Sequence, residues 1–125
     1  MGSSPSPAPP VSPMPDRVPV SVVCVFNDAH VRERCLDRSI DLLRVEAPDV
    51  DYIPVDNVHG QFASAGRALN EGARQARHEV VVFAHQDVFL HSLVALERAA
   101  ALLVTDARLG MLGAGVIKVR VDVLR

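Results

Sequence analysis

The sequence predicts an α/β fold with a mostly parallel sheet and helices on both faces. Segments rich in β-branched residues alternate with segments whose apolar residues recur at helical spacing, in the order β-α-β-α-β-α-β. The run over residues 80–84 lacks polar alternation, which is typical of a central parallel strand that helices cover on both faces. Together these two observations favour a Rossmann-like arrangement.

The first half of the folded region predicts two strands and one helix between them. Residues 18–26 predict a strand because they are rich in β-branched residues and Pro19 suits a strand start. A helix over residues 30–45 follows from the spacing of Val31, Cys35, Leu36, Ile40 and Leu43. Residues 51–55 predict a short strand near a sheet edge, since Pro54 has no N–H to donate.

The second half predicts two helices and two further strands. A helix over residues 62–77 is expected to bury the face formed by Phe62, Ala65, Leu69, Ala73 and Ala76. A strand over residues 80–84 precedes a helix that Ser92 can cap, with the inward residues Leu93, Leu96, Ala100 and Leu103. Residues 110–117 predict a fourth strand. Its glycines imitate a dinucleotide fingerprint, but they lie inside a strand pattern, so close backbone packing is the better interpretation.

Composition limits the classes of protein that fit. Residues 1–17 are rich in proline and serine, so we expect a disordered tail there and one domain over residues 18–125. The tail does not resemble a secretory signal, and no apolar run approaches the about 20 residues of a membrane span. We therefore expect a cytoplasmic protein without a transmembrane segment.

Charge and cysteine usage exclude further classes. The net charge is −2, and no basic stripe suggests nucleic-acid binding. An anionic ligand would need local amides, a few arginines or a metal ion. Cys24 and Cys35 have no metal-ligand spacing, so we expect both to be reduced, with a disulfide as the minority alternative.

Polar residues follow the first three predicted strands at the point where each strand ends. Parallel strands place their carboxyl ends along one rim, where open α/β sheets bind ligands. We therefore expect the three polar tips to converge on one site. The tips are Asn27-Asp28, Asp56-Asn57 and His85-Gln86-Asp87.

Each candidate residue has a functional and a structural interpretation. The Asp87 carboxylate can bind Mg²⁺ or Mn²⁺, which favour oxygen ligands, or it can cap the following helix. His85 can assist at the metal or contact a phosphate, or it can hydrogen-bond beneath the loop. Asp56 can accept a hydrogen bond from a base or ribose, or it can form a turn. A zinc site of His85, Asp87 and His91 has no defensible strand or helix geometry and is the weakest alternative.

Two residues of the second predicted helix are ambiguous. Asn70 can face the ligand rim or be exposed, and exposure is favoured because no other feature points to the rim. Arg67 can contact a phosphate or be a solvated helix residue. Neither residue is assigned from the sequence pattern alone.

Four blocks of the sequence together resemble the N-terminal half of family 2-type glycosyltransferases. The blocks occur in the family's order and with similar spacing between about residues 18 and 115; they cover residues 20–27, 55–57, 68–72 and 82–87. The resemblance is greatest to a prokaryotic subgroup in which His-Gln-Asp stands where relatives carry Asp-x-Asp. It implies a GT-A fold, whose Rossmann-like half binds a nucleotide-diphosphate sugar.

The resemblance also implies roles for individual residues. Asn27 and Asn57 would lie beside the nucleotide, and Asp56 would bind the base. Asp87, assisted by His85, would hold Mn²⁺ or Mg²⁺ against the diphosphate, where a cation stabilises the leaving group. The remaining nucleotide-binding candidates are Asn70, near the donor sugar or its diphosphate, and Arg67.

The sequence departs from the family pattern in two ways. The triplet has one carboxylate, and the family's acceptor-binding half and catalytic base lie beyond the region of resemblance. Residues 118–125 do not resemble the family's continuation, so we expect a domain truncated at its C-terminus, and its catalytic residues are unassigned.

The favoured function is that of a glycosyltransferase-like domain that binds a nucleotide-diphosphate sugar through a divalent metal. The acceptor would be a saccharide such as a surface polysaccharide. The domain would contact this acceptor or a membrane surface. The alternative is a non-catalytic remnant or a nucleotide-binding or interaction module. A flavodoxin-like or receiver-type domain is disfavoured, because no later strand ends in a Lys-Pro-type pair.

Overall fold

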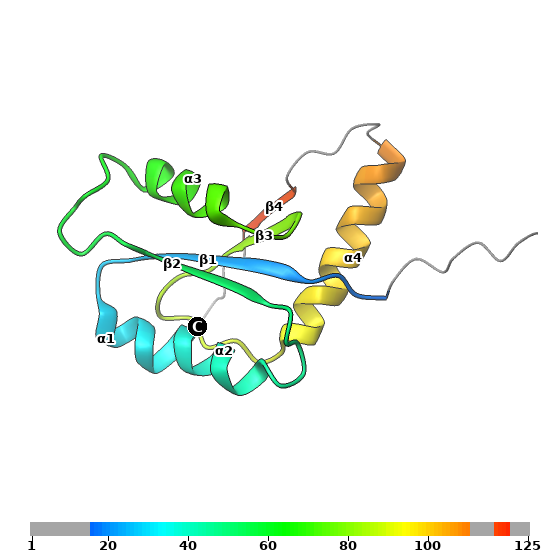
Figure 1. The fold of residues 1–125 in the computed structure, drawn as a ribbon, viewed down its shortest axis with the longest axis horizontal. Helices are drawn as coiled ribbons and strands as arrows, with labels where there is room; N and C mark the ends of the chain where they lie inside the picture. Colours follow the sequence, from blue (N-terminus) through cyan, green and yellow to red (C-terminus); the bar gives the residue numbers. More distant parts are fainter. Residues whose placement is uncertain (1–15, 111–116, 121–125) are drawn as a thin grey trace, which may run out of the picture.

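A four-stranded parallel sheet forms the centre of the fold. The computed structural model describes residues 16–110 and 117–120. The strands lie in the order β2-β1-β3-β4, and every neighbouring pair is parallel (Figure 1). Their bounds are β1 (Val20–Phe26), β2 (Asp51–Asp56), β3 (Val80–Phe83) and β4 (Ile117–Arg120). The predicted parallel α/β fold is therefore confirmed, and β2, which contains Pro54, is an edge strand as expected.

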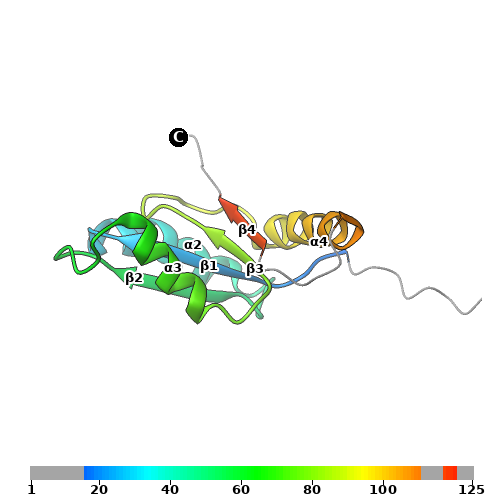
Figure 2. The ribbon, with the colours of Figure 1, turned by 90° about the horizontal axis from the view of Figure 1, so that it is seen from above.

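Helices cover both faces of this sheet. One continuous helical segment follows β1 and consists of α1 (Ala29–Arg32), a π-helical turn η1 (Glu33–Asp37) and α2 (Arg38–Leu43). It shares one face with α4 (Leu93–Gly110), whereas α3 (Ala65–Gln75) covers the opposite face (Figure 2). None of the described helices combines the length and apolar character that a membrane span requires.

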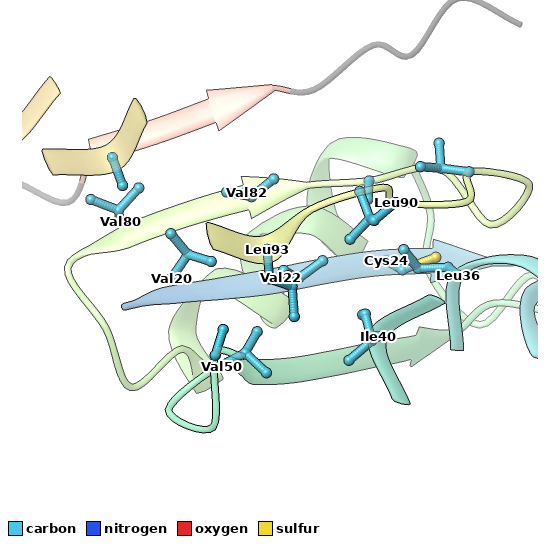
Figure 3. Packing of buried hydrophobic residues seen from close by; sticks show 14 of the residues in the cluster. Val20, Val22, Cys24, Leu36, Ile40, Val50, Val80, Val82, Leu90 and Leu93 are labelled. Atoms are coloured by element: carbon cyan, nitrogen blue, oxygen red, sulfur yellow. The ribbon is translucent and has the colours of Figure 1, made fainter. Parts of the chain in front are cut away.

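Successive residues of β1 and β3 point to opposite faces, so each face has its own core. Val22 belongs to the larger core beneath α2 and α4, and its neighbour Val23 belongs to the smaller core beneath α3. In the larger core, Leu36 and Ile40 from the helical segment and Leu93 from α4 are fully buried (Figure 3). Each such side chain contributes about 1.5–3 kcal/mol through burial. Coverage of both faces explains why the strands lack polar alternation.

Helix α3 approaches the sheet through its smallest residues, which corrects the centre of the predicted face, although Phe62 and Ala76 at its ends pack against the smaller core as predicted. The buried residues are Ala68 and Gly72, whereas Ala65 is exposed and Leu69 is half-buried. A Cβ atom at Gly72 would lie 2.3 Å from Val23 Cγ1. The close approach needs glycine at this position, and it leaves larger side chains such as Leu69 at the flank of the contact.

Two further predictions need correction in the second half. Leu103 was expected to face inward, but it is 36% exposed, and Val104 is buried instead. Glu97 of α4 is also buried, because its carboxylate pairs with Arg17 Nε at 2.8 Å. The fourth strand was expected over residues 110–117, but Gly110 ends α4 and β4 begins at Ile117.

Some predictions concern residues at the borders of the described regions. The glycines at positions 113 and 115 and the tail over residues 1–15 lie outside the described residues. Arg17, which was assigned to the tail, contacts α4 through Glu97. Both cysteines are free thiols in the structure, with Cys24 buried and Cys35 half-buried.

Candidate functional site

The three polar tips converge at the carboxyl ends of the strands, as predicted. The backbone N–H of Asn57, just after β2, donates to the carbonyl oxygen of Phe26 at 2.9 Å. Gln86, just after β3, bonds to residues just after β1. The central strand β1 is therefore tied at its end to both neighbouring strands.

Gln86 uses both ends of its side-chain amide in this contact. Its Oε1 accepts from the backbone N–H groups of Asn27 at 2.9 Å and Asp28 at 3.1 Å. Its Nε2 donates to Asn27 Oδ1 at 2.8 Å. The sequence interpretation assigned no role to Gln86. The available signal was its position between a strand end and a candidate acid, together with an amide that both donates and accepts.

The loop that carries Asp87 is anchored on both sides. Before it, the Ala84 N–H donates to the Val23 carbonyl oxygen at 2.9 Å. Within it, the Val88 N–H donates to the His85 carbonyl oxygen at 3.1 Å, which closes a turn around Asp87. After it, the Val88 and Leu90 side chains are buried in the larger core. Asp87 itself is half-buried and is carried by this turn.

A polar cleft of about 440 Å³ lies between these tips. We call it the first cleft; it is lined by Val25, Phe26, Asn27, Val31, Asn57, His85, Gln86 and Asp87. None of these lining residues is a lysine or arginine, and Asp87 is their single carboxylate. Within the described part of the chain, the cleft therefore offers amide, imidazole and carboxylate groups, but no permanent positive charge.

The donor set of the first cleft suits a hard divalent cation better than zinc. Asp87 and His85 are its two side chains of metal-ligating type. Mg²⁺ commonly uses one or two protein carboxylates and completes its shell with phosphates and water. A zinc site of His85, Asp87 and His91 is wrong, because the described residues contain no group of three potential ligands. The His91 ring instead lies beside the Phe89 ring, with centroids 6.2 Å apart.

An apolar cleft of about 330 Å³ adjoins the first cleft on the α3 face of the sheet. This second cleft is lined by Val25, Ala65, Leu69, Phe83, Ala84 and His85. The two clefts share Val25 and His85, so they meet at the His85 imidazole. Sequence reasoning missed the second cleft because its apolar lining residues were interpreted as core.

Asp56 and Asn57 both form the turn that follows β2. Asp56 Oδ1 accepts from the Val58 N–H at 2.9 Å, and the side chain is exposed. Asn57 Oδ1 accepts from the Phe62 N–H at 3.1 Å, and Gly60 completes the turn with φ 64°. Of the two side chains, only Asn57 lines the first cleft. These turn hydrogen bonds give both residues a local structural role, and the nucleotide-binding roles of Asp56 and Asn57 stay predictions.

The structure does not bring Asn70 and Arg67 into the first cleft. Both are exposed on α3 and line a separate hollow of about 360 Å³, which Glu71 and Arg74 also line. This hollow shares no lining residue with either cleft. Their proposed contacts with a nucleotide stay predictions.

A half-buried polar network supports the wall of the first cleft. The Arg32 guanidinium lies 4.0 Å from the centre of the Phe26 ring, and its Nε donates to Asp37 Oδ2 at 3.0 Å. The Tyr52 hydroxyl donates to Asp37 Oδ1 at 2.5 Å. Burial, reinforced by this hydrogen bond, raises the pKa of Tyr52. Burial also raises the pKa of the neighbouring Cys24 thiol to about 12, so both groups are neutral in the fold.

Comparison with known proteins relates this chain to a family. A family model described as a glycosyltransferase-like family matches residues 21–121 of the chain. No curated protein and no solved structure gives a significant match. The matched residues include every residue that lines the first and second clefts.

Proposed function

The chain belongs to this glycosyltransferase-like family, and we propose that it binds a nucleotide-diphosphate sugar through a divalent metal, for transfer of the sugar to an acceptor. The observation that carries the proposal is the first cleft. It lies at the carboxyl ends of a parallel sheet, where such sheets bind nucleotides, and it contains one carboxylate among neutral polar groups.

The charge of the first cleft supports a requirement for metal. A diphosphate is strongly anionic, and none of the described residues that line the cleft is a lysine or arginine. The N–H groups of Asn27 and Asp28 are already bonded to Gln86. Mn²⁺ or Mg²⁺ held by Asp87, with His85 as a second ligand, would supply the missing positive charge. When bound, such an ion stabilises the charge that develops on the leaving diphosphate.

The remaining candidates divide by position. Asn27 and Asn57 line the first cleft and are the proposed nucleotide contacts there, with Asp56 beside them as the acid for the base. Asn70 and Arg67, in their separate hollow, are the weaker candidates. The second cleft offers an apolar surface to the ring of a base or sugar. We assign no catalytic base, because Asp87 is the single carboxylate among the described lining residues.

Calorimetric titration with UDP and GDP, with and without Mn²⁺, tests the proposal. We expect wild type to bind one nucleotide in a Mn²⁺-dependent manner and Asp87→Asn to bind it at least about tenfold more weakly, a difference of about 1.4 kcal/mol. Asp41→Asn is a matched control, because Asp41 is exposed on α2. Equal nucleotide affinity of wild type and Asp87→Asn, or the absence of detectable binding by both, would contradict the proposed site.

Transfer itself is a separate measurement. Release of free nucleoside diphosphate from a sugar donor, in the presence of acceptor saccharides, would report it. A cytoplasmic location and contact with a membrane surface or an acceptor saccharide stay predictions.

A further inference from the structure

We propose that Gln86 is the positioning residue of the first cleft, because its side-chain amide latches the Asp87 loop to the end of β1. The positioning of Asp87 matters for binding only if Asp87 holds the metal, so this inference rests on the proposed function. The latch itself is a structural element that can be measured without a ligand.

The latch begins where the ladder between β1 and β3 has ended. That ladder runs from Val20 paired with Val80 to Val23 paired with Phe83. One further bond, from the Ala84 N–H to the Val23 carbonyl oxygen, extends it. On its other side, β1 continues to pair with β2 as far as Phe26. The ends of β1 and β3 therefore separate after Val23, and the first cleft lies at this separation.

Gln86 rejoins the two chain segments beyond that gap. Its three hydrogen bonds connect residues 58 and 59 positions apart in the sequence, at distances of 2.8–3.1 Å. The bonds define the direction of the amide, because Oε1 must face the two backbone N–H groups while Nε2 faces Asn27 Oδ1. A side chain with this donor and acceptor pattern is held in one orientation.

The latch has two consequences for Asp87. Asp87 follows Gln86 directly, so a fixed Gln86 restrains the backbone position of Asp87 relative to Asn27. The latch also occupies two backbone donors that an anion would otherwise use. Residues that orient a metal ligand typically affect metal affinity about 10- to 100-fold when substituted. We expect an effect of that size on metal–nucleotide binding.

The test compares Gln86→Met with Gln75→Met. Methionine keeps the length of the side chain but removes both the donor and the acceptor. Gln75 is a matched control because it is exposed on α3 and makes one 3.4 Å bond to Glu71 in the same helix. We expect Gln86→Met to weaken binding of UDP or GDP with Mn²⁺ by about 10- to 100-fold and Gln75→Met to leave it unchanged.

Amide hydrogen exchange measured by NMR gives a readout that needs no ligand. We expect Gln86→Met to speed exchange of the Asn27 and Asp28 amides while the core amide of Val22 exchanges as in wild type. Gln86→Glu keeps an oxygen acceptor for both N–H groups but replaces the Nε2 donor with a second oxygen that faces Asn27 Oδ1, so its protection should lie between those of Gln86→Met and wild type. Faster exchange at Val22 in parallel with these two amides would overturn the latch.

The outcomes separate the two proposals. Wild-type binding that Gln86→Met leaves intact overturns the positioning role while the proposed function stands. Absence of binding in wild type overturns the proposed function. The latch is then tested by hydrogen exchange of the Asn27 and Asp28 amides alone. Equal exchange of these amides in wild type and Gln86→Met overturns the latch in either case.

Discussion

Polar side chains cross-link the strands at both ends of the sheet, but the two rims differ in what they leave open. At the amino-end rim, Ser21 Oγ donates to Asp51 Oδ2 at 2.9 Å and accepts from the His78 N–H at 3.0 Å. Asp51 Oδ2 also accepts from the Arg77 N–H at 2.8 Å. At the carboxyl-end rim, the Gln86 side chain links the end of β3 to β1, and the Asn57 backbone N–H links the end of β2 to β1.

The difference lies in burial around these links. Ser21 is fully buried and the Asp51 side chain is 13% exposed, whereas Asn27 is exposed and Gln86 borders the first cleft. Among the described residues, no buried side-chain nitrogen or oxygen lacks a partner. Similar hydrogen bonds between strands thus occur at a buried rim and at a rim that borders a cleft. Hydrogen bonding between strands does not by itself identify a binding site.

High pH should remove the difference between the two rims, because it destabilises the strands that both rims share. The pKa of Cys24 is raised from 9.0 to about 12, and that of Tyr52 is also raised. Each group therefore ionises more readily in the unfolded chain. The Cys24 contribution to stability is fully present below pH 9 and is lost as the pH rises towards 12, and the Tyr52 contribution falls only above its ordinary pKa of 10. We expect Tm to fall by several degrees between pH 8 and pH 11.

Cys24→Ala isolates the thiol contribution to this pH dependence. The variant should start from a lower Tm, because it leaves a small cavity, but should lose less stability between pH 8 and pH 11. An equal loss of stability between pH 8 and pH 11 in the variant and in wild type would contradict the assignment of this pH dependence to Cys24.

Nucleotide and metal should act on the carboxyl-end rim alone. A ligand at 100 times its Kd stabilises the fold by about 2.7 kcal/mol, so UDP or GDP with Mn²⁺ should raise Tm. We expect EDTA to abolish this increase and to leave Tm without nucleotide nearly unchanged. A nucleotide-induced increase that survives EDTA would contradict the role of the metal, and thermal scans on wild type suffice for the measurement.

Substitution of Asp51 should break the amino-end rim without affecting binding. Asp51→Ala removes the acceptor of Ser21 and of the Arg77 N–H, so the free energy of unfolding should fall by about 1–3 kcal/mol. Urea denaturation measures this loss, and Asp49→Ala, at an exposed neighbouring position, is the control. Loss of nucleotide affinity in folded Asp51→Ala would show that the two rims are coupled.

The smallest effect is expected at Arg32, which supports the wall of the first cleft. Arg32→Ala removes the contact with Phe26 and the ion pair with Asp37, at a cost of about 1 kcal/mol. Arg34→Ala, on the exposed surface of the same helical segment, should be neutral in urea denaturation. Equal stability of the two variants would argue against a supporting role for the network.

The sequence predicted the strands and helices whose positions follow from the spacing of apolar residues and from the alternation of strands and helices. An unbroken apolar run identified β3 as a central strand, and parallel strands necessarily bring Asn27, Asn57 and Asp87 to one rim. The contact of Gly72 with Val23 was not predicted, because it depends on how closely α3 approaches the sheet. That distance is a tertiary property, and apolar spacing alone favoured the larger side chains instead.

Side-chain direction explains the rest of what was missed at the site. The Gln86 latch depends on the separation of β1 and β3, which no local pattern in the sequence encodes. The second cleft is lined by residues such as Leu69 and Phe83, whose composition does not distinguish a lined cavity from a filled core. For Asp56, the sequence left a turn and a binding role open, and the structure shows the turn bond to the Val58 N–H.

The π-helical turn η1 has a consequence for how this chain can change in length. Residues five positions apart point about 140° away from each other in a regular α-helix, yet Arg32 and Asp37 meet because the turn between them is wider. A chain one residue shorter here would place the same pair four apart, a spacing that a regular α-helix satisfies. The loss of one residue within this turn is therefore expected to be tolerated, with the cleft wall preserved.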